Sequence, residues 1–217
     1  MIERPILFNA EMVRAILDGR KTQTRRVIKP NPDTFCGWTG VEGRGYWPAD
    51  IEGDPAKCPY GQTDDRLWVR EAWAPGYQDG GWGTIFRADG YFSLGARKHE
   101  RGPYFHAKEV GSWIRWRPSI HMPRWASRIT LEITSVRVQR LQEISEEDAM
   151  AEGVEKLGEF PCITPWKNYL LKPGQPSAMN HSIARASFMS LWDSINGVDA
   201  HKVNPWVWAV SFKMVKP

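Results

Sequence analysis

Residues 129–138 read ITLEITSVRV and carry the clearest strand pattern in the chain. In the first half, the apolar residues that alternate with polar ones are Ile129, Leu131 and Ile133. The two valines that follow Thr134-Ser135 are in the opposite phase. Such a switch predicts either a β-bulge or a change of the buried face. Because bulges bend a sheet, the stretch favours a sheet that curls toward a barrel.

Further strands and helices are predicted on both sides of this stretch. We expect strands at 2–8, 65–73 and 206–215, and helices at about 10–18, 146–152 and 181–195. The apolar residues that share one face of the closing strand are Trp206, Trp208, Val210, Phe212 and Met214. The intervening segments 30–65, 76–103 and 155–180 read as irregular, the first two being rich in Gly, Pro or Asp. Since core elements are spread over the whole length, we expect one α+β, mainly β, domain over 1–217.

The composition and cysteine spacing of the chain exclude several kinds of functional site. The chain has 217 residues, a net charge of +4 and three cysteines, with no CxxC pair. Neither a zinc site nor a disulfide framework is indicated, and the spacing of the five histidines predicts no metal site. No apolar run reaches the ~20 residues of a membrane helix, and the N-terminus lacks a signal-peptide core. We therefore expect a soluble, cytoplasmic protein without a metal or another cofactor, and a weak Mg²⁺ or Mn²⁺ site built from distant carboxylates is the alternative.

Residues 19–26 read GRKTQTRR and follow the first predicted helix. Gly19 is placed to end that helix, and the next residues present four cations and two hydroxyls. Clustered cations predict a negatively charged partner, and we name Arg20, Arg25 and Arg26 as candidate nucleic-acid ligands. A solvated turn is the alternative interpretation.

Residues 112–128 interleave arginines with tryptophans and contain no acidic residue. Cations for phosphates and flat rings for bases suit a single-stranded nucleic acid, so Arg124 and Trp125 are further candidates. The alternative is a pair of strands with arginines at the rim and tryptophans in the core. Arg70, in the strand at 65–73, is another candidate for binding a phosphate.

Four pieces of the chain together resemble the ASCH family of PUA-like β-barrels, and similar long forms are encoded by phages and prophages. The pieces are Gly19-x-Lys21-x-x-Thr24-x-Arg26, residues 65–71, residues 129–153 and residues 205–212. The resemblance implies a small β-barrel flanked by helices, with a cleft beside the basic loop for RNA or a modified nucleoside. Residues 30–63, 76–111 and 155–180 would be insertions in that domain.

Some compact members of the family are amidohydrolases that deacetylate N(4)-acetylcytidine. Their functional Lys, Thr and Glu correspond here to Lys21, Thr24 and Glu152. The resemblance thus implies Thr24 as the nucleophile, Lys21 as its activator and Glu152 as the proton carrier. A weak nucleophile such as a hydroxyl needs such a neighbour at neutral pH.

Other functions stay open at this point. The family also includes a ribonuclease and presumed RNA-binding modules, and DNA stays an alternative ligand. Glu71 is a second possible carboxylate, although a salt bridge to Arg26 would give it a structural task. An amidohydrolase, a non-catalytic RNA-binding module and a ribonuclease are the three hypotheses that the residues support.

Overall fold

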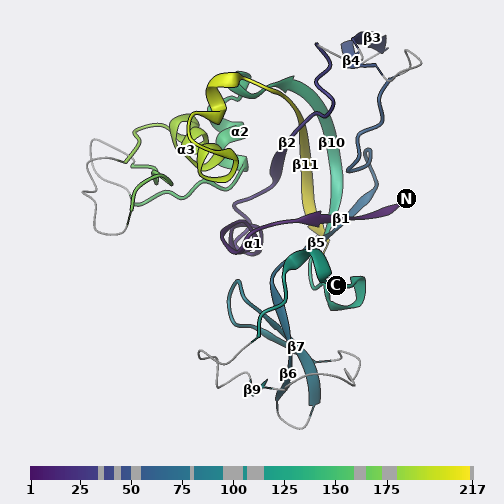
Figure 1. The fold of residues 1–217 in the computed structure, drawn as a ribbon, viewed down its shortest axis with the longest axis vertical. Helices are drawn as coiled ribbons and strands as arrows, with labels where there is room; N and C mark the ends of the chain where they lie inside the picture. Colours follow the sequence, from purple (N-terminus) through teal and green to yellow (C-terminus); the bar gives the residue numbers. More distant parts are fainter. Residues whose placement is uncertain are drawn as a thin grey trace.

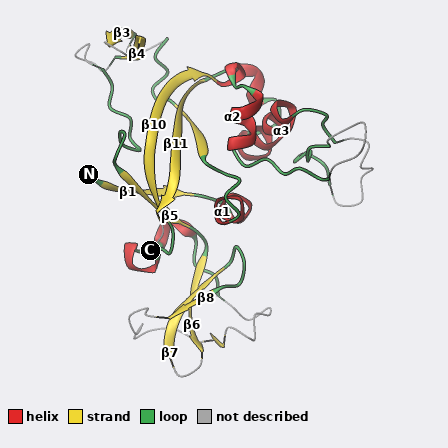
Figure 2. Ribbon diagram, turned by 180° about the vertical axis from the view of Figure 1, so that it is seen from behind, coloured by secondary structure: helices red, strands yellow, loops and turns green. Residues whose placement is uncertain are grey.

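A computed structural model shows a mixed α/β chain with mostly strands and few helices (Figures 1 and 2). It describes residues 1–33, 37–41, 45–49, 55–78, 81–94, 105–106, 115–158, 165–172 and 180–215. In these ranges no helix has the length and apolar character needed to cross a membrane.

The largest sheet has five strands in the order β1-β5-β10-β11-β2. The strands are β1 (Glu3–Leu7), β5 (Arg66–Arg70), β10 (Thr130–Arg140), β11 (Trp206–Val215) and β2 (Gln23–Val27). β1 pairs in parallel with β5, and the other three pairings are antiparallel. Strands β1, β5, β10 and β11 were expected from their apolar patterns and are confirmed, whereas β2 was not predicted as a strand. Segments from both ends of the sequence therefore meet in one sheet.

The phase switch in β10 is a β-bulge. The register with β11 shifts between Ile133 and Ser135. Ile129, Leu131 and Ile133 belong to the main core, and Val136 and Val138 pack against the same core. The extra residue thus restores the inward direction of the valines instead of changing the buried face. The sheet curves strongly along β10 and β11 (Figure 1), but no closed barrel is found among the described strands.

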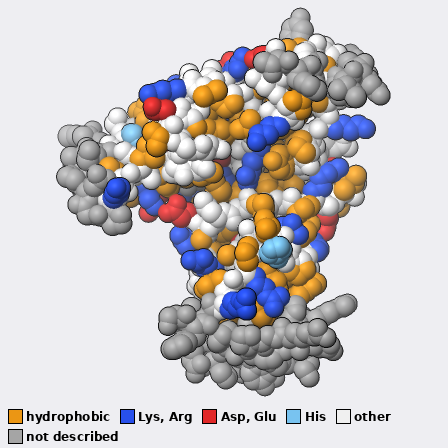
Figure 3. Space-filling view, viewed as in Figure 1, with side chains coloured by type: hydrophobic (Ala, Val, Ile, Leu, Met, Phe, Trp, Pro, Cys, Tyr) orange, Lys and Arg blue, Asp and Glu red, His pale blue; other side chains and the backbone are white. Residues whose placement is uncertain are grey.

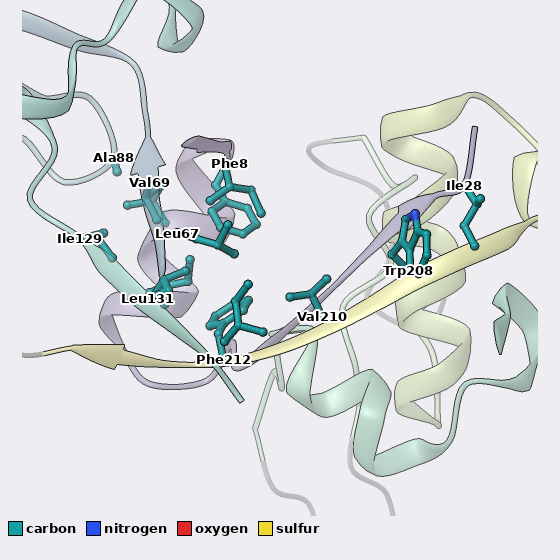
Figure 4. Packing of buried hydrophobic residues seen from close by; sticks show 14 of the residues in the cluster. Phe8, Ile28, Leu67, Val69, Ala88, Ile129, Leu131, Trp208, Val210 and Phe212 are labelled. Carbon is teal, nitrogen blue, oxygen red and sulfur yellow. The ribbon is translucent and has the colours of Figure 1, made fainter. Parts of the chain in front are cut away.

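The main core lies against the inner face of this curved sheet (Figure 4). Side chains from β5, β10 and β11 point toward one another there, with Phe8 just after β1 and Ile28 just after β2 in the same core (Figure 4). Trp208, Val210 and Phe212 of β11 are buried as expected, whereas Met214 near the end of the strand is exposed. Burial at this scale is the main stabilising term for such a sheet.

Helix α1 (Ala10–Leu17) joins β1 to β2 and is confirmed as predicted. The Asn9 side chain accepts a hydrogen bond from the N–H of Met12, which satisfies one free donor of the first turn. Gly19 follows the helix with a φ of 73°, the left-handed conformation that glycine adopts most readily. The chain then continues into β2, so the basic residues 20–26 directly follow the end of α1.

Two helices cover the other end of the sheet, α2 (Glu146–Ala151) and α3 (Ala184–Asn196). They pack with Leu141, Ile144, Val154 and Val207 in a second core. The Ser145 side chain caps α2 by accepting a hydrogen bond from the N–H of Asp148. The short 3-10 turns are η2 (Ser119–His121), η3 (Arg124–Ala126), η4 (Leu141–Glu143) and η6 (Ala200–Val203).

The expectation of irregular chain at 30–65 and 76–103 is wrong for the described residues that form strands, whereas residues 56–65 are irregular as expected. A hairpin of β3 (Trp38–Val41) and β4 (Gly45–Pro48) lies in the first range. A second sheet, ordered β8-β7-β6-β9, comprises β8 (Phe92–Leu94), β7 (Gly81–Phe86), β6 (Trp73–Gln78) and β9 (Phe105–His106). Glycines within β6 and β7 break the apolar alternation, which is why periodicity missed these strands.

The described part of 112–128 does not form the alternative pair of strands either. Residues 115–128 make two 3-10 turns and one isolated bridge, between Arg117 and Trp73. Pro118 and Pro123 each precede a turn, and proline cannot donate a hydrogen bond to a strand ladder. The rest of this stretch lies outside the described residues.

Candidate functional site

Lys21 lies inside the protein, between α1 and the end of α2. Its backbone N–H donates to the carbonyl of Ala15, and the N–H of Thr22 donates to the carbonyl of Ala151. These two bonds place the start of β2 against both helices. The Lys21 side chain is 0% exposed, so this lysine is not one of the solvated cations of a surface turn.

Lys21 and Glu152 meet although 131 residues separate them. The Lys21 Nζ lies 2.8 Å from the Glu152 Oε2 and 2.8 Å from the Glu152 backbone carbonyl. Glu152 is the C-cap residue of α2, a position at which a carboxylate faces the negative end of the helix. The cation at Lys21 offsets that unfavourable placement.

Arg25 extends the pair into a network. One guanidinium nitrogen of Arg25 lies 3.0 Å from the Glu152 Oε1 and also binds the Gln23 side-chain carbonyl. The other lies 2.7 Å from the Asp148 Oδ2, which Arg137 contacts at 2.9 Å. Alternating charges in this order neutralise one another, from the buried Lys21, Glu152 and Arg25 out to the exposed Arg137.

Two groups in the network, Lys21 and Asp148, have a pKa below the ordinary value. Complete burial lowers the pKa of Lys21, although the Glu152 carboxylate opposes the shift. Burial alone would raise the pKa of Asp148, but Arg25 and Arg137 hold it below its ordinary value. A lysine with a lowered pKa exchanges protons more easily near neutral pH than an exposed one.

Gly153 permits the close approach of Lys21 to the end of α2. It has a φ of 83° and follows Glu152 directly. A Cβ at this position would lie 2.7 Å from the Cβ of Lys21 and 3.0 Å from the Cβ of Ala15. Neither atom lies at the far end of a flexible side chain, so a larger residue here would force the two elements apart.

Thr24 is buried in β2, opposite Val210 of β11. It lines a small cavity of about 80 Å³ together with Glu152 and the apolar side chains of Phe188, Leu191 and Trp192. The structure therefore brings Thr24 and Glu152 to one cavity, as expected. Lys21 is not among the described residues that line it, and it reaches the cavity only through its contact with the Glu152 Oε2.

A larger cleft of about 420 Å³ lies next to the small cavity. Met12, Glu152 and Leu191 line both spaces, so these side chains separate the two. On the rim, Lys167 binds Glu11 at 3.2 Å and Glu155 at 2.9 Å. A cleft of this volume is of the size that accepts a small molecule.

The basic residues of 19–26 are divided between the surface and the interior. Arg20 is exposed and binds Asp18 and the carbonyl of Gly153. Arg25 has a 0% exposed side chain and is held by internal partners. Arg26 donates to the carbonyl of Leu7 at 2.7 Å. In this arrangement Arg20 faces the cleft, while Arg25 and Arg26 support the scaffold.

The other predicted nucleic-acid ligands lie away from this cleft. Arg70 donates to the carbonyl of Met122 and stacks over Trp68. Arg124 forms an exposed ion pair with Glu3 at 2.8 Å. Trp125 is 42% exposed, with its ring edge-on to Trp73. These residues belong to the region between the two sheets and do not join Lys21.

The suggested partnership of Glu71 with Arg26 is wrong. Glu71 instead binds Arg128 through both carboxylate oxygens, at 3.0 and 3.1 Å. Arg128 also binds Asp89 and stacks over Phe86, so it ties the small sheet to the end of β5. Burial raises the pKa of Glu71 even though Arg128 opposes the shift.

Two features of the site region were not foreseen. The carboxylate of Asp148, in the first turn of α2, binds Arg25 and Arg137. Away from the site, Asp193 and His201 pair at 2.7 Å, and Asp199 lies beside them. Among the described residues, these three form the one group whose carboxylate and imidazole atoms could together hold a cation. Asp199 already pairs with Lys202. Sequence spacing did not indicate either arrangement.

No family model, no curated protein and no solved structure that was compared with the chain matches it.

Proposed function

We propose that this chain is an ASCH-like protein of the PUA-like β-barrel type that hydrolyses the N-acyl amide of an acylated cytidine. One observation carries the proposal: Thr24 and Glu152 line one cavity, and ion pairs with Lys21 and Arg25 hold the Glu152 carboxylate in place. A hydroxyl beside a fixed proton carrier is the arrangement that nucleophilic acyl transfer requires.

The two adjoining cavities suit the two parts of such a substrate. The larger cleft has room for a nucleoside, and the small cavity has room only for a short acyl chain. Phe188 and Trp192 would pack against a methyl group, and Arg25 and Arg26 line the same small cavity. Met12 and Leu191 lie where the amide would pass between the two spaces.

In the proposed reaction the Thr24 hydroxyl oxygen adds to the acyl carbon, and its proton passes to Glu152. The bond from carbon to the exocyclic nitrogen then breaks, and Glu152 returns the proton to the leaving amine. Water hydrolyses the resulting Thr24 ester in the same way, releasing the carboxylic acid. Lys21 acts through Glu152, so we refine its role from activator of Thr24 to positioning residue.

The test is turnover of N(4)-acetylcytidine by the purified protein, followed as release of cytidine. Glu152→Gln and Thr24→Val should each lower kcat by at least about a hundredfold, the usual contribution of a positioned acid–base group. Matched controls are Glu147→Gln, an exposed acid on the same helix, and Thr22→Val, an exposed hydroxyl in the same loop. A wild-type protein that leaves the nucleoside intact would sink the proposal.

A non-catalytic RNA-binding module is the second candidate. The half-exposed indole of Trp125 favours it, with Arg70 stacked on Trp68 nearby. The visible face of the large sheet also carries Lys and Arg side chains among hydrophobic ones (Figure 3). Under this alternative, affinity for single-stranded RNA falls steeply with salt and with Trp125→Ala, and Thr24→Val has no effect on it.

A further inference from the structure

We propose that a second cleft, separate from the Lys21 site, binds a nucleoside monophosphate. The cleft measures about 470 Å³ and lies between the start of β1, the segment 55–65 and the bulge of β10. It shares no lining residue with the two cavities beside Glu152. The inference goes beyond the proposed hydrolysis and does not depend on it.

One side of the cleft is cationic. Arg4 and Lys57 line it, with Asp65 as the one acidic residue among the described lining residues. The Asp65 carboxylate is bound within the fold, since it accepts from Arg4 at 2.8 Å and from the N–H groups of Ile2 at 2.8 Å and Gln62 at 3.3 Å. The cleft therefore keeps a net positive charge for an incoming anion.

Arg4 is held in place and still open to a ligand. Its side chain is 32% exposed, while that of Asp65 is 6% exposed. The N–H of Ile2 and the Arg4 guanidinium hold the pKa of Asp65 below its ordinary value, against the effect of burial, so the anchor stays ionised. A guanidinium fixed at one nitrogen can offer its remaining N–H groups to a phosphate without losing further side-chain entropy.

Gly61 supports the interpretation of a built site. It has a φ of 116°, and a Cβ there would lie 2.9 Å from a guanidinium nitrogen of Arg4 and 3.0 Å from the Asp65 carboxylate. The backbone thus approaches the ion pair as closely as a glycine permits. The same residue lines the cleft, so its missing side chain also keeps the space open.

The cleft also has apolar lining residues. Ile2, Trp47, Ala56 and Val136 line it, and hydroxyls are present at Thr63 and Ser135. The volume is too large for a phosphate ion alone and lies within the range of small-molecule sites. A phosphate joined to a sugar and a flat base is the ligand that uses the cations, the hydroxyls and the apolar residues of this lining together.

The experiment is isothermal titration of the full-length protein with each ribonucleoside 5′-monophosphate, with the matching nucleoside and inorganic phosphate in separate titrations. We expect one monophosphate to bind more tightly than either fragment. Lys57→Gln and Arg4→Gln should each weaken it by about tenfold or more, the loss expected for a charge-assisted hydrogen bond. The control variants, Lys202→Gln and Arg185→Gln, replace exposed cations outside the cleft.

Three results would overturn the proposal: no heat with any monophosphate, equal affinity for phosphate alone, or binding that both cleft variants leave intact. If Arg4→Gln does not fold, as judged by circular dichroism, Lys57→Gln decides, because Lys57 is exposed. The hydrolysis proposal can fail independently, since Thr24→Val should not change monophosphate affinity.

Discussion

Replacing Lys21 by methionine should destabilise the protein far more than an ordinary loss of charge. The methionine side chain is nearly as long as that of lysine and has no donor. It therefore leaves the Glu152 carboxylate and carbonyl without the Nζ that lies 2.8 Å from each. Breaking one partner of a buried ion pair costs about 3–5 kcal/mol. Because Arg25 still contacts Glu152, we expect the lower end, about 3 kcal/mol.

The assay is chemical denaturation at neutral pH, with thermal unfolding as a second readout. A loss of about 3 kcal/mol lowers the Tm of a domain of this size by about 6–12 °C. The matched control is Lys167→Met, since Lys167 also contacts two carboxylates but its side chain is 30% exposed. Such a surface pair contributes at most about 1 kcal/mol.

The double variant Lys21→Met with Glu152→Leu separates pairing from burial. If the two groups stabilise each other, the double variant should lose at least about 1–2 kcal/mol less than the sum of the single losses. A Lys21→Met variant no less stable than Lys167→Met would refute the reasoning. Additive single losses would equally contradict the idea that the Lys21–Glu152 pair acts as a unit.

Three further changes test the surroundings of this network. Gly153→Ala should cost about 2 kcal/mol or more in denaturation experiments, because its Cβ would crowd Lys21 in a left-handed conformation. Asp148→Asn should destabilise the protein at neutral pH, and its difference from wild type should shrink as the pH falls through the lowered folded-state pKa of Asp148; a difference independent of pH would contradict this. Arg128→Leu should expose the small sheet to proteolysis at about 3 kcal/mol lower stability, whereas unchanged cleavage would show that its ion pairs are not the tie.

Much of the large sheet could be predicted from local pattern. The alternation in β10, its bulge, the closing strand and the capped helix α1 all follow from residues close together in sequence. The small sheet could not be predicted in this way. Its strands contain glycines, and cross-strand partners such as Trp73 and Phe86 decide its pairing. The turn-rich composition of this region therefore hid the strands of the second sheet, which can be identified only from their pairing with one another.

The candidate site, too, was predicted from the sequence only in part. By itself the sequence determined that a helix ends at Gly19 and that a basic, hydroxyl-bearing segment follows it. Only the tertiary structure decided that Lys21 is enclosed, that it pairs with Glu152 and that Thr24 faces a cavity with Glu152. The physical reason is that burial and charge pairing depend on distances through space, and 131 residues separate the two partners along the chain.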